Sequence, residues 1–154
     1  MIRLVRMDEA EYQAYLEKSI PAYAADKLQA GNWTADEALE RAQLEYGHFL
    51  PQGVDTPGHF VGKLLNEVGE VVGYLWYAGL DNNPGTAFIF DFEIYETFRR
   101  RGYASEALAV LVDEARGQGY KRLALHVFGA NTAARMLYKK NGFIETNVQM
   151  ARDI

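Results

Sequence analysis

The sequence predicts one α/β domain built on an α+β mixed sheet covered by helices. Strand-like segments in the middle of the chain are separated only by short turns, which indicates antiparallel pairing. In the second half, strand-like and helical segments alternate, which predicts a parallel strand joined through a helix. The 154 residues fit one domain, and no repeat or linker divides them, so we expect a single domain over residues 1–154.

The first segments are predicted to be a strand and a helix. Ile2–Met7 has the length and composition of a short strand. Asp8 is followed three residues later by Glu11, the spacing of a capping box, which predicts that a helix begins here. Apolar residues recur at helical intervals until Gly31, and Pro21 is expected to bend or divide this helix because proline has no backbone N–H to donate.

A second helix and three strands follow. Thr34 and Glu37 repeat the capping-box spacing, which predicts a helix that continues to about Tyr46. The turn-rich stretch Leu50–Gly58 is expected to be a loop. The three strands are expected at His59–Asn66, Glu70–Gly79 and Thr86–Tyr95.

The second half is predicted to alternate helix and strand. The expected elements are a helix at Gly102–Gly117, a strand at Lys121–Val127, a helix at Asn131–Asn141 and a last strand at Phe143–Met150. The first of these helices carries alanine, leucine and valine on one face, which is typical of packing against a sheet. The predicted order is therefore β-α-α-β-β-β-α-β-α-β.

Composition excludes several classes of protein. The absence of cysteine removes disulfides, thiolate nucleophiles and cysteine zinc sites, and neither of the two serines lies in a G-x-S-x-G motif. A net charge of −5 argues against nucleic-acid binding, although residues 91–154 alone carry 10 basic and 8 acidic side chains. No apolar run is long enough to span a membrane, and the acidic N-terminus does not resemble a signal peptide, so we expect a cytoplasmic protein without membrane association.

The stretch Asp91–Ser105 has the pattern of an anion site. A strand runs into a short loop that contains three arginines and a glycine, and a helix follows directly. The first N–H groups of a helix lack partners and carry partial positive charge, while glycine permits a tight turn and close approach of a phosphate. The motifs of P-loop nucleotide hydrolases and of dinucleotide-binding folds are both absent. The sequence therefore predicts a pyrophosphate site of another kind.

Two motifs resemble those of the GNAT-family N-acetyltransferases. Arg99-x-x-Gly102-x-Ala104 is similar to the family pattern [QR]-x-x-G-x-[GA]. The segment Leu125–Phe143 is similar to its second block, L-x-V-x-x-x-N-x-x-A-x-x-L-Y-x-x-x-G-F. One helix and one strand separate the two, as in the family, and the chain resembles small bacterial stand-alone members over almost its whole length. The resemblance implies the GNAT acyl-CoA N-acyltransferase fold, with two central strands that splay apart.

The resemblance also implies a cofactor site. Acetyl-CoA would lie between the splayed strands as acetyl donor, with no metal. Main-chain contacts to its pantetheine arm would come from Phe92, Glu93 and Ile94. Arg99 fills the first motif position, and the pyrophosphate would be wrapped by Arg100, Arg101, Gly102, Tyr103, Ala104 and Ser105. Asn131 would bond the pantetheine arm, and it is equally suited to cap the helix that follows.

The implied reaction is direct transfer of the acetyl group to an amine within a ternary complex. Tyr138 occupies the position of the family's usual acid and would protonate the departing thiolate. The base that accepts the proton of the amine stays open between Glu93, His126 and a chain of water molecules. A GNAT-fold module that binds acyl-CoA without turnover is the alternative, and the presence of both Tyr138 and Asn131 favours the enzyme.

The alternation of side chains along the third strand and the composition of the first half add expectations about the site that receives the acceptor. One face of the third strand is expected to be polar, with Asp91, Glu93 and Tyr95, and the other apolar, with Phe90, Phe92 and Ile94. The acidic and aromatic first half would suit a cationic amine. The acceptor is therefore expected to be a small-molecule amine or a protein N-terminus. Dimers are common in the family, so the resemblance allows a homodimer, although no feature of the sequence itself indicates one.

Overall fold

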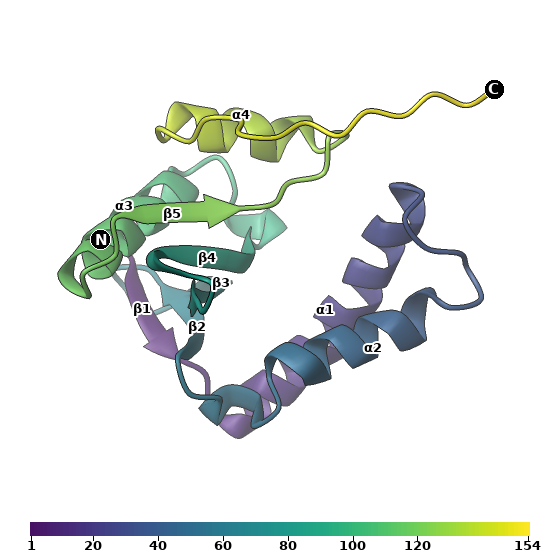
Figure 1. The fold of residues 1–154 in the computed structure, drawn as a ribbon. Helices are drawn as coiled ribbons and strands as arrows, with labels where there is room; N and C mark the ends of the chain where they lie inside the picture. The colour runs from purple at the N-terminus through teal and green to yellow at the C-terminus, as the bar shows by residue number, and fades with distance from the viewer.

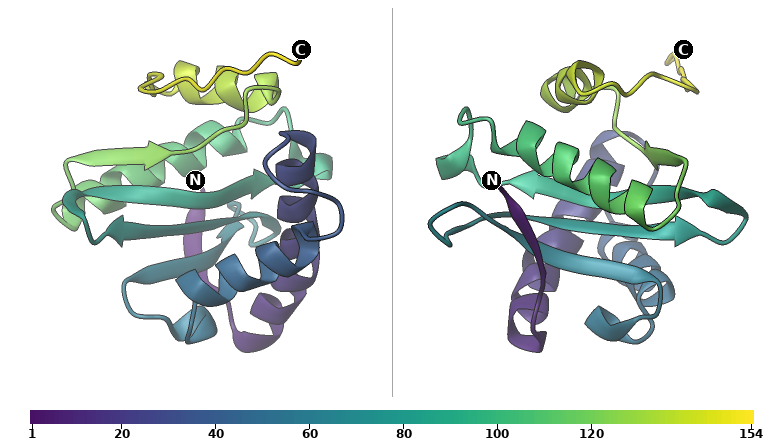
Figure 2. Two further views of the ribbon diagram at one scale, coloured as in Figure 1. Left: turned by 45° about the vertical axis from the view of Figure 1, so that its right-hand side comes forward. Right: turned by 90° about the vertical axis from the view of Figure 1, so that its left-hand side faces the viewer.

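The computed structural model describes all 154 residues as a five-stranded sheet with helices on both faces (Figures 1 and 2). The strands are β1 (Arg3–Arg6), β2 (His59–Leu65), β3 (Val71–Leu80), β4 (Asn83–Ile94) and β5 (Arg122–Leu125). They lie in the order β1-β2-β3-β4-β5, and all neighbours are antiparallel except β4 and β5, which are parallel. The predicted mixed sheet is confirmed.

Four helices and two short 3-10 turns connect the strands. They are α1 (Glu9–Gln29), α2 (Ala38–Phe49), η1 (Gly53–Asp55), η2 (Glu96–Phe98), α3 (Tyr103–Gly117) and α4 (Thr132–Lys140). The helix α2 begins and ends about three residues later than predicted, because a turn precedes Ala38. None of the four helices combines the length and the apolar character that crossing a membrane requires.

The N-terminus of α1 is closed by a capping box, as predicted. The Asp8 carboxylate accepts from the Glu11 N–H at 2.8 Å, and the Asp8 N–H donates to the Glu11 carboxylate at 3.0 Å. The predicted division at Pro21 is wrong, since α1 continues through it as one helix. Proline deprives only the Glu17 carbonyl of its helical partner, and both residues are exposed, so water can take the place of the missing N–H.

Two hydrophobic clusters occupy the two faces of the sheet. On one face, Leu108 and Leu111 of α3 pack against Leu75 of β3 and Ile89 of β4. On the other face, α1 and α2 cover Trp76 of β3 with a set of tyrosines, Tyr12, Tyr15 and Tyr46. The views in Figure 2 show α3 on one side of the sheet and α1 with α2 on the other. The sheet is thus held rigidly from both sides.

A β-bulge interrupts β4 at Phe90. Trp76 of β3 lies opposite Asp91 while Tyr77 lies opposite Ile89, so Phe90 has no partner in β3. The Phe90 ring stacks on Trp76 with centroids 4.6 Å apart, on the face that α1 and α2 cover. The predicted alternation is therefore wrong at Phe90, because the extra residue of a bulge turns two consecutive side chains to the same face.

The predicted last strand, Phe143–Met150, is not formed. After Phe143, whose N–H donates to the Tyr138 carbonyl at 3.0 Å, no residue makes a backbone hydrogen bond. The segment runs extended beside α4 to the C-terminus (Figure 1). A strand is defined by hydrogen bonds to a neighbour, and within this chain none of the sheet edges provides them to this segment. The element order therefore ends at α4.

Candidate active site

The strands β4 and β5 separate halfway along β4, which opens the sheet. They pair only from Thr86 opposite Arg122 to Ile89 opposite Leu125. The strand β4 continues to Ile94, and its pairing with β3 continues to the same point. The second half of β4 therefore has a strand on one side only, which is the predicted splay.

The backbone N–H and carbonyl groups of successive β4 residues point alternately toward β3 and into this opening. The carbonyl of Glu93 points at Gly73 in β3, where an added Cβ would collide with it, and the Tyr95 N–H donates to the Val72 carbonyl at 2.8 Å. Because backbone groups of successive residues point in opposite directions, those of Phe92 and Ile94 are directed into the opening. Two of the three predicted main-chain positions therefore face the opening, and Glu93 faces β3.

The turn before α3 leaves the start of that helix without any cap. Arg100 and Gly102 both adopt left-handed backbone conformations, with φ of 63° and 83°. Gly102 is the N-cap residue and has no side chain to accept a hydrogen bond. The first helical bond is donated by Glu106 to the Gly102 carbonyl, so the preceding N–H groups of the turn and first helical residues have no acceptor in the protein. Such a cluster of N–H groups suits an anion.

Of the three predicted arginines, one is held by the protein. Arg99 donates from Nε to the Ile94 carbonyl at 3.0 Å and from Nη2 to a Glu93 carboxylate oxygen at 3.2 Å. Arg99 therefore fixes the end of β4 and takes the Ile94 carbonyl out of the opening. Arg101 lies 5.5 Å from the ring centroid of Phe98, and Arg100 is exposed. Both remain beside the open start of α3.

Asn131 caps α4, as one of its two predicted roles requires. Its side-chain oxygen accepts from the Ala134 N–H at 3.2 Å, which satisfies one of the free N–H groups at the start of α4. Ser105 near the start of α3 contacts the end of the same helix, since its hydroxyl accepts from the Asn141 side chain at 3.1 Å. These contacts fix α4 beside α3, next to the opening.

Tyr138 lies on α4 with its hydroxyl free. The ring is half-buried against the cluster under α3 and makes an edge contact with Phe143 at 5.5 Å between centroids. The hydroxyl makes no hydrogen bond within the protein. Burial, and secondarily the negative charge of Asp91, raise the pKa of Tyr138 to about 12. The phenol is therefore protonated at neutral pH and can donate a hydrogen bond.

The two carboxylates of β4 differ in their environment. Glu93 has both oxygens engaged, one by the Tyr74 hydroxyl at 2.6 Å and the other by Arg99. Asp91 accepts from the Tyr15 hydroxyl at 2.6 Å, and burial raises its pKa from 3.8 to about 6, with a further contribution from the charge of Glu93. No pattern in the sequence distinguishes Asp91 as a base, because only the packing of α1 against β4 shows that its carboxylate is buried.

His126 follows β5 and lies on the rim of the opening. Its ring contacts Phe128 edge-on at 5.0 Å between centroids, and it is exposed. Burial on one side and the charge of Lys27 lower its pKa. Lys27 comes from the end of α1, with its ammonium 6.0 Å from the ring centroid of Phe128. The structure thus adds the end of α1 to the site, and no motif in the sequence indicated it.

Most of the aromatic residues of the first half, which composition alone would offer to a cationic acceptor, are core residues. The buried ones are Tyr12, Tyr15, Trp33, Tyr46, Trp76 and Tyr77. They fill the space between the sheet and its helices, and Tyr77 lies on the α3 face rather than with the others. Aromatic residues supply large apolar area to a core, and composition alone does not distinguish that role from ligand binding. No three His, Asp or Glu side chains are grouped as a metal site would require.

Comparison with known proteins identifies the family. The model of the acetyltransferase (GNAT) family matches residues 19–143. The chain is 38% identical to the uncharacterized N-acetyltransferase YycN of Bacillus subtilis over 99% of both chains, and 38% identical to YdgE of the same organism over 96% of this chain and 95% of YdgE. The crystal structure of YycN covers 100% of this chain with a TM-score of 0.94.

A more distant relative has a named acceptor. The ribosomal protein bS18-alanine N-acetyltransferase of Haemophilus ducreyi is 29% identical over 62% of this chain and 75% of its own length.

The match to the family model includes both motifs, the open start of α3 and the splayed half of β4. With sequence, fold and the geometry of the opening in agreement, this chain belongs to the GNAT acetyltransferase family and is an acyltransferase.

Proposed function

We propose that the protein transfers an acetyl group from acetyl-CoA to a primary amine by direct attack in a ternary complex. The observation that carries the proposal is the uncapped start of α3 beside the open side of β4. The first feature suits a pyrophosphate, and the second offers backbone groups to an amide-rich chain. Both face the same opening, so a ligand that has a pyrophosphate and an amide-rich arm can engage them together.

The residues around the opening fit acetyl-CoA. The N–H groups of Gly102, Tyr103, Ala104 and Ser105, with the side chains of Arg100 and Arg101, would hold the pyrophosphate. The backbone groups of Phe92 would bind the pantetheine arm as a neighbouring strand would, and of Ile94 only the N–H is left to face the acyl end of the ligand, since Arg99 engages its carbonyl. Asn131 would reach the same arm from the start of α4. When bound, the donor supplies a thioester whose carbonyl carbon an amine can attack.

Asp91 is the residue best suited to act as the base. A primary amine with a pKa near 10.4 arrives protonated and must lose a proton before it attacks. Asp91 has a pKa raised to about 6, which is close to the value that favours a base at neutral pH. Glu93 is held by Tyr74 and Arg99 and is less free to accept a proton, and His126 remains the alternative on the rim.

Two groups are suited to stabilise the negative charges that develop on the thioester oxygen and on the departing sulfur. The Ile94 N–H, directed into the opening, would donate to the thioester oxygen as it becomes negative. Tyr138 would donate its phenolic proton to the departing thiolate, since its pKa of about 12 keeps it protonated. The ammonium thus gives its first proton to Asp91, which releases it to solvent. After attack the nitrogen loses a second proton, and this proton replaces the one that Tyr138 gives to the thiolate.

The acceptor is proposed to be an amine that carries positive charge before reaction. Burial raises the pKa of both Asp26 and Asp91, and the negative charge of Glu93 raises both further, so three carboxylates lie near one another between α1 and β4 and this side of the opening is negative. A protein N-terminus is favoured among the acceptors by the relative that acts on the alanine of bS18. Small-molecule amines remain the second class to test.

Calorimetry and a thiol-release assay test the proposal together. Calorimetry should show that acetyl-CoA binds the full chain, and thiol release should rise above background hydrolysis with at least one member of a panel of peptide N-termini and small amines. Binding without acceptor-dependent release from any amine would favour an acyl-CoA-binding module without turnover. Absence of binding by folded protein would refute the placement of the pyrophosphate at α3.

A further inference from the structure

The last turn of α1 lies near both of the strands that separate at the opening. Asp26 lies on the β4 side, since burial and then the negative charge of Glu93 raise its pKa. Lys27 lies near the end of β5, because its ammonium is 6.0 Å from the ring centroid of Phe128. Its charge, after burial, also lowers the pKa of His126. Consecutive residues of one helix therefore place a carboxylate near β4 and an ammonium near the end of β5.

Aromatic rings hold Lys27 in place. Its ammonium lies 5.6 Å from the ring centroid of Tyr23 on α1 and 5.5 Å from that of Trp33 in the loop after α1. With Phe128, which follows β5, the three rings come from three different segments. Tyr23 and Trp33 also contact each other edge-on, with centroids 5.6 Å apart. Ring faces attract a cation without neutralising it, so the ammonium is fixed in position while its charge stays unmatched.

Lys27 has no anionic partner in the protein. Of the 16 lysine and arginine side chains, three are half-buried, namely Lys27, Lys63 and Arg135. Lys63 pairs with Glu11. Arg135 pairs with Glu145 at 2.7 Å. Lys27 forms no ion pair. Partial burial removes water from a cation, and an anion normally compensates for this loss, so an anionic ligand would stabilise the ammonium here.

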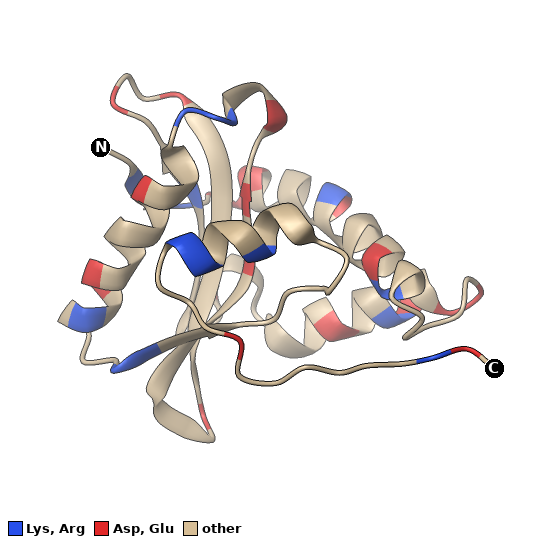
Figure 3. Ribbon diagram, turned by 90° about the horizontal axis from the view of Figure 1, so that it is seen from above, with Lys and Arg blue, Asp and Glu red and all other residues tan.

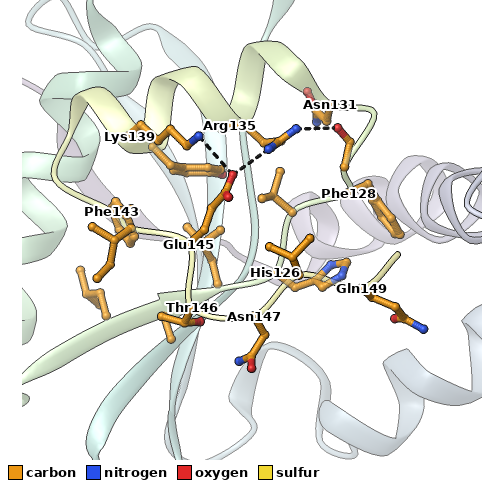
Figure 4. A pocket seen from close by; sticks show the side chains of 18 of the residues that line it. His126, Phe128, Asn131, Arg135, Lys139, Phe143, Glu145, Thr146, Asn147 and Gln149 are labelled. Carbon is orange, nitrogen blue, oxygen red and sulfur yellow. Dashed lines mark hydrogen bonds and ion pairs between the residues drawn. The ribbon is translucent and has the colours of Figure 1, made fainter. Parts of the chain in front are cut away.

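This ammonium lies next to a cavity at the opening. The cavity has a volume of about 1420 Å³, and Figure 4 shows His126 and Phe128 together on one side of it. Another wall is α4, which carries basic segments and no acidic one in Figure 3. The two basic side chains of α4 that line the cavity, Arg135 and Lys139, are paired with Glu145, as the dashed lines in Figure 4 show. The cations on that wall are therefore engaged within the protein, and the ammonium at the end of α1 is not.

We propose that Lys27 binds a carboxylate of the acceptor, so that the preferred acceptor is an amine that carries a carboxylate on the same molecule. This inference rests on the proposed transfer to an amine and names the class of acceptor. The ammonium of the acceptor would face Asp26 and Asp91, and its carboxylate would face Lys27. A free amino acid supplies this carboxylate from its main chain. A protein N-terminus supplies it from an aspartate or glutamate close to its first residue.

Two other roles do not account for the position of Lys27. The phosphates of the donor are proposed to lie at the start of α3, which covers the face of the sheet opposite α1 (Figure 2). A positive charge in the last turn of α1 complements the helix dipole, but that role needs no contact with Phe128 on the other side of the opening. A carboxylate on the acceptor accounts both for the fixed position of the ammonium and for its missing partner.

Matched pairs of acceptors test the proposal by thiol release. Alanine and alaninamide form one pair, and the C-terminally amidated peptides Ala-Asp-Ala and Ala-Asn-Ala form the other, so that only one carboxylate differs within each pair. In at least one pair, Lys27→Gln should lower kcat/KM by about 10-fold for the member with the carboxylate and by much less for the uncharged member. The pair that responds identifies the source of the carboxylate. Lys18→Gln removes the same charge from an exposed position of α1 and should affect both members equally.

Calorimetry adds a measurement that needs no turnover. CoA has no acetyl group to donate, so the binding of each acceptor can be measured on protein saturated with CoA. The acceptor with the carboxylate should bind about 10-fold more weakly to Lys27→Gln than to Lys18→Gln. If amines are acetylated but Lys27→Gln affects both members of each pair equally, the proposed function holds and the role of Lys27 is overturned. If no amine in the panel binds or releases thiol, transfer to an amine fails, and this inference fails with it.

Discussion

The helices α1 and α3 differ in whether the protein itself satisfies the N–H groups at their starts. Each helix begins with N–H groups that lack helical partners. At α1, Asp8 and Glu11 satisfy them within the protein, whereas at α3 the N-cap is Gly102 and no side chain takes part. A helix end that is left open, next to a strand whose backbone is also open, leaves polar groups available to a ligand. The capped end serves stability, and the open end is the one that we propose to serve binding.

Gly102→Glu should have the largest effect on ligand binding at the open start of α3. A glutamate places a carboxylate where the pyrophosphate would lie and also forces a side chain onto a backbone with φ of 83°. We expect affinity for acetyl-CoA to fall by about 100-fold or more, which is about 2.7 kcal/mol, in calorimetry. Gly69→Glu is the matched control, because Gly69 has φ of 87° and open space around it but lies on the β2–β3 turn.

The comparison separates backbone strain from loss of the ligand site. Both glutamate variants should lose about 1–2 kcal/mol of stability from the left-handed backbone, measured by urea denaturation. Only Gly102→Glu should lose acetyl-CoA binding. If Gly102→Glu binds acetyl-CoA as tightly as the Gly69→Glu protein, the open end of α3 does not hold the pyrophosphate.

Asp91→Asn should lower activity while raising stability. Without the base, kcat is expected to fall by about 100-fold, and the rise of kcat/KM with pH through about 6 should disappear. The folded protein keeps a proton on Asp91 that the unfolded chain releases between pH 3.8 and about 6, so this carboxylate lowers stability as the pH rises through that interval. Asparagine removes that loss, and the free energy of unfolding at pH 7 should rise by about 1–3 kcal/mol.

Asp113→Asn provides the control for charge, because Asp113 is exposed at the far end of α3. It should change neither the pH profile nor stability by more than about 0.5 kcal/mol. An Asp91→Asn enzyme that retains full activity and the same pH profile would exclude Asp91 as the base and direct attention to His126.

Tyr138→Phe tests the acid on the other side of the opening. Loss of the phenol should lower kcat by about 10–100-fold and leave the affinity for acetyl-CoA almost unchanged, because the proton is needed only when the thiolate departs. Tyr12→Phe removes a phenol from the core between α1 and the sheet and should not affect kcat. Equal kcat in Tyr138→Phe and the unaltered enzyme would remove Tyr138 from the mechanism.

Asp8→Ala should give the smallest effect and completes the comparison. It removes the cap at the closed start of α1, and we expect the free energy of unfolding to fall by about 1 kcal/mol. Acetyl-CoA affinity should not change, since the capping contacts of Asp8 are with Glu11 and not with any residue proposed to bind the ligand. A loss of binding in this variant would show that the capped end and the open end are coupled.

The local patterns of the sequence were sufficient for most elements. The capping box at Asp8, the apolar face of α3 and the turn between β2 and β3 each depend on neighbours within a few residues, and each was predicted correctly. The last strand, 143–150, was wrong because a strand pattern specifies one apolar face but does not specify the partner. The bulge at Phe90 was missed for a related reason, since it depends on the register between β3 and β4.

The sequence by itself determined the family, the order of most elements and the open turn at Arg99–Ala104, because these depend on motifs and short-range spacing. Tertiary structure decided which polar groups face the opening. The burial of Asp91 under Tyr15, the engagement of Glu93 by Tyr74 and Arg99, and the approach of Lys27 to Phe128 each join residues distant in the sequence. A pKa depends on surroundings in space, so only the packing of α1 on the sheet distinguished the two carboxylates.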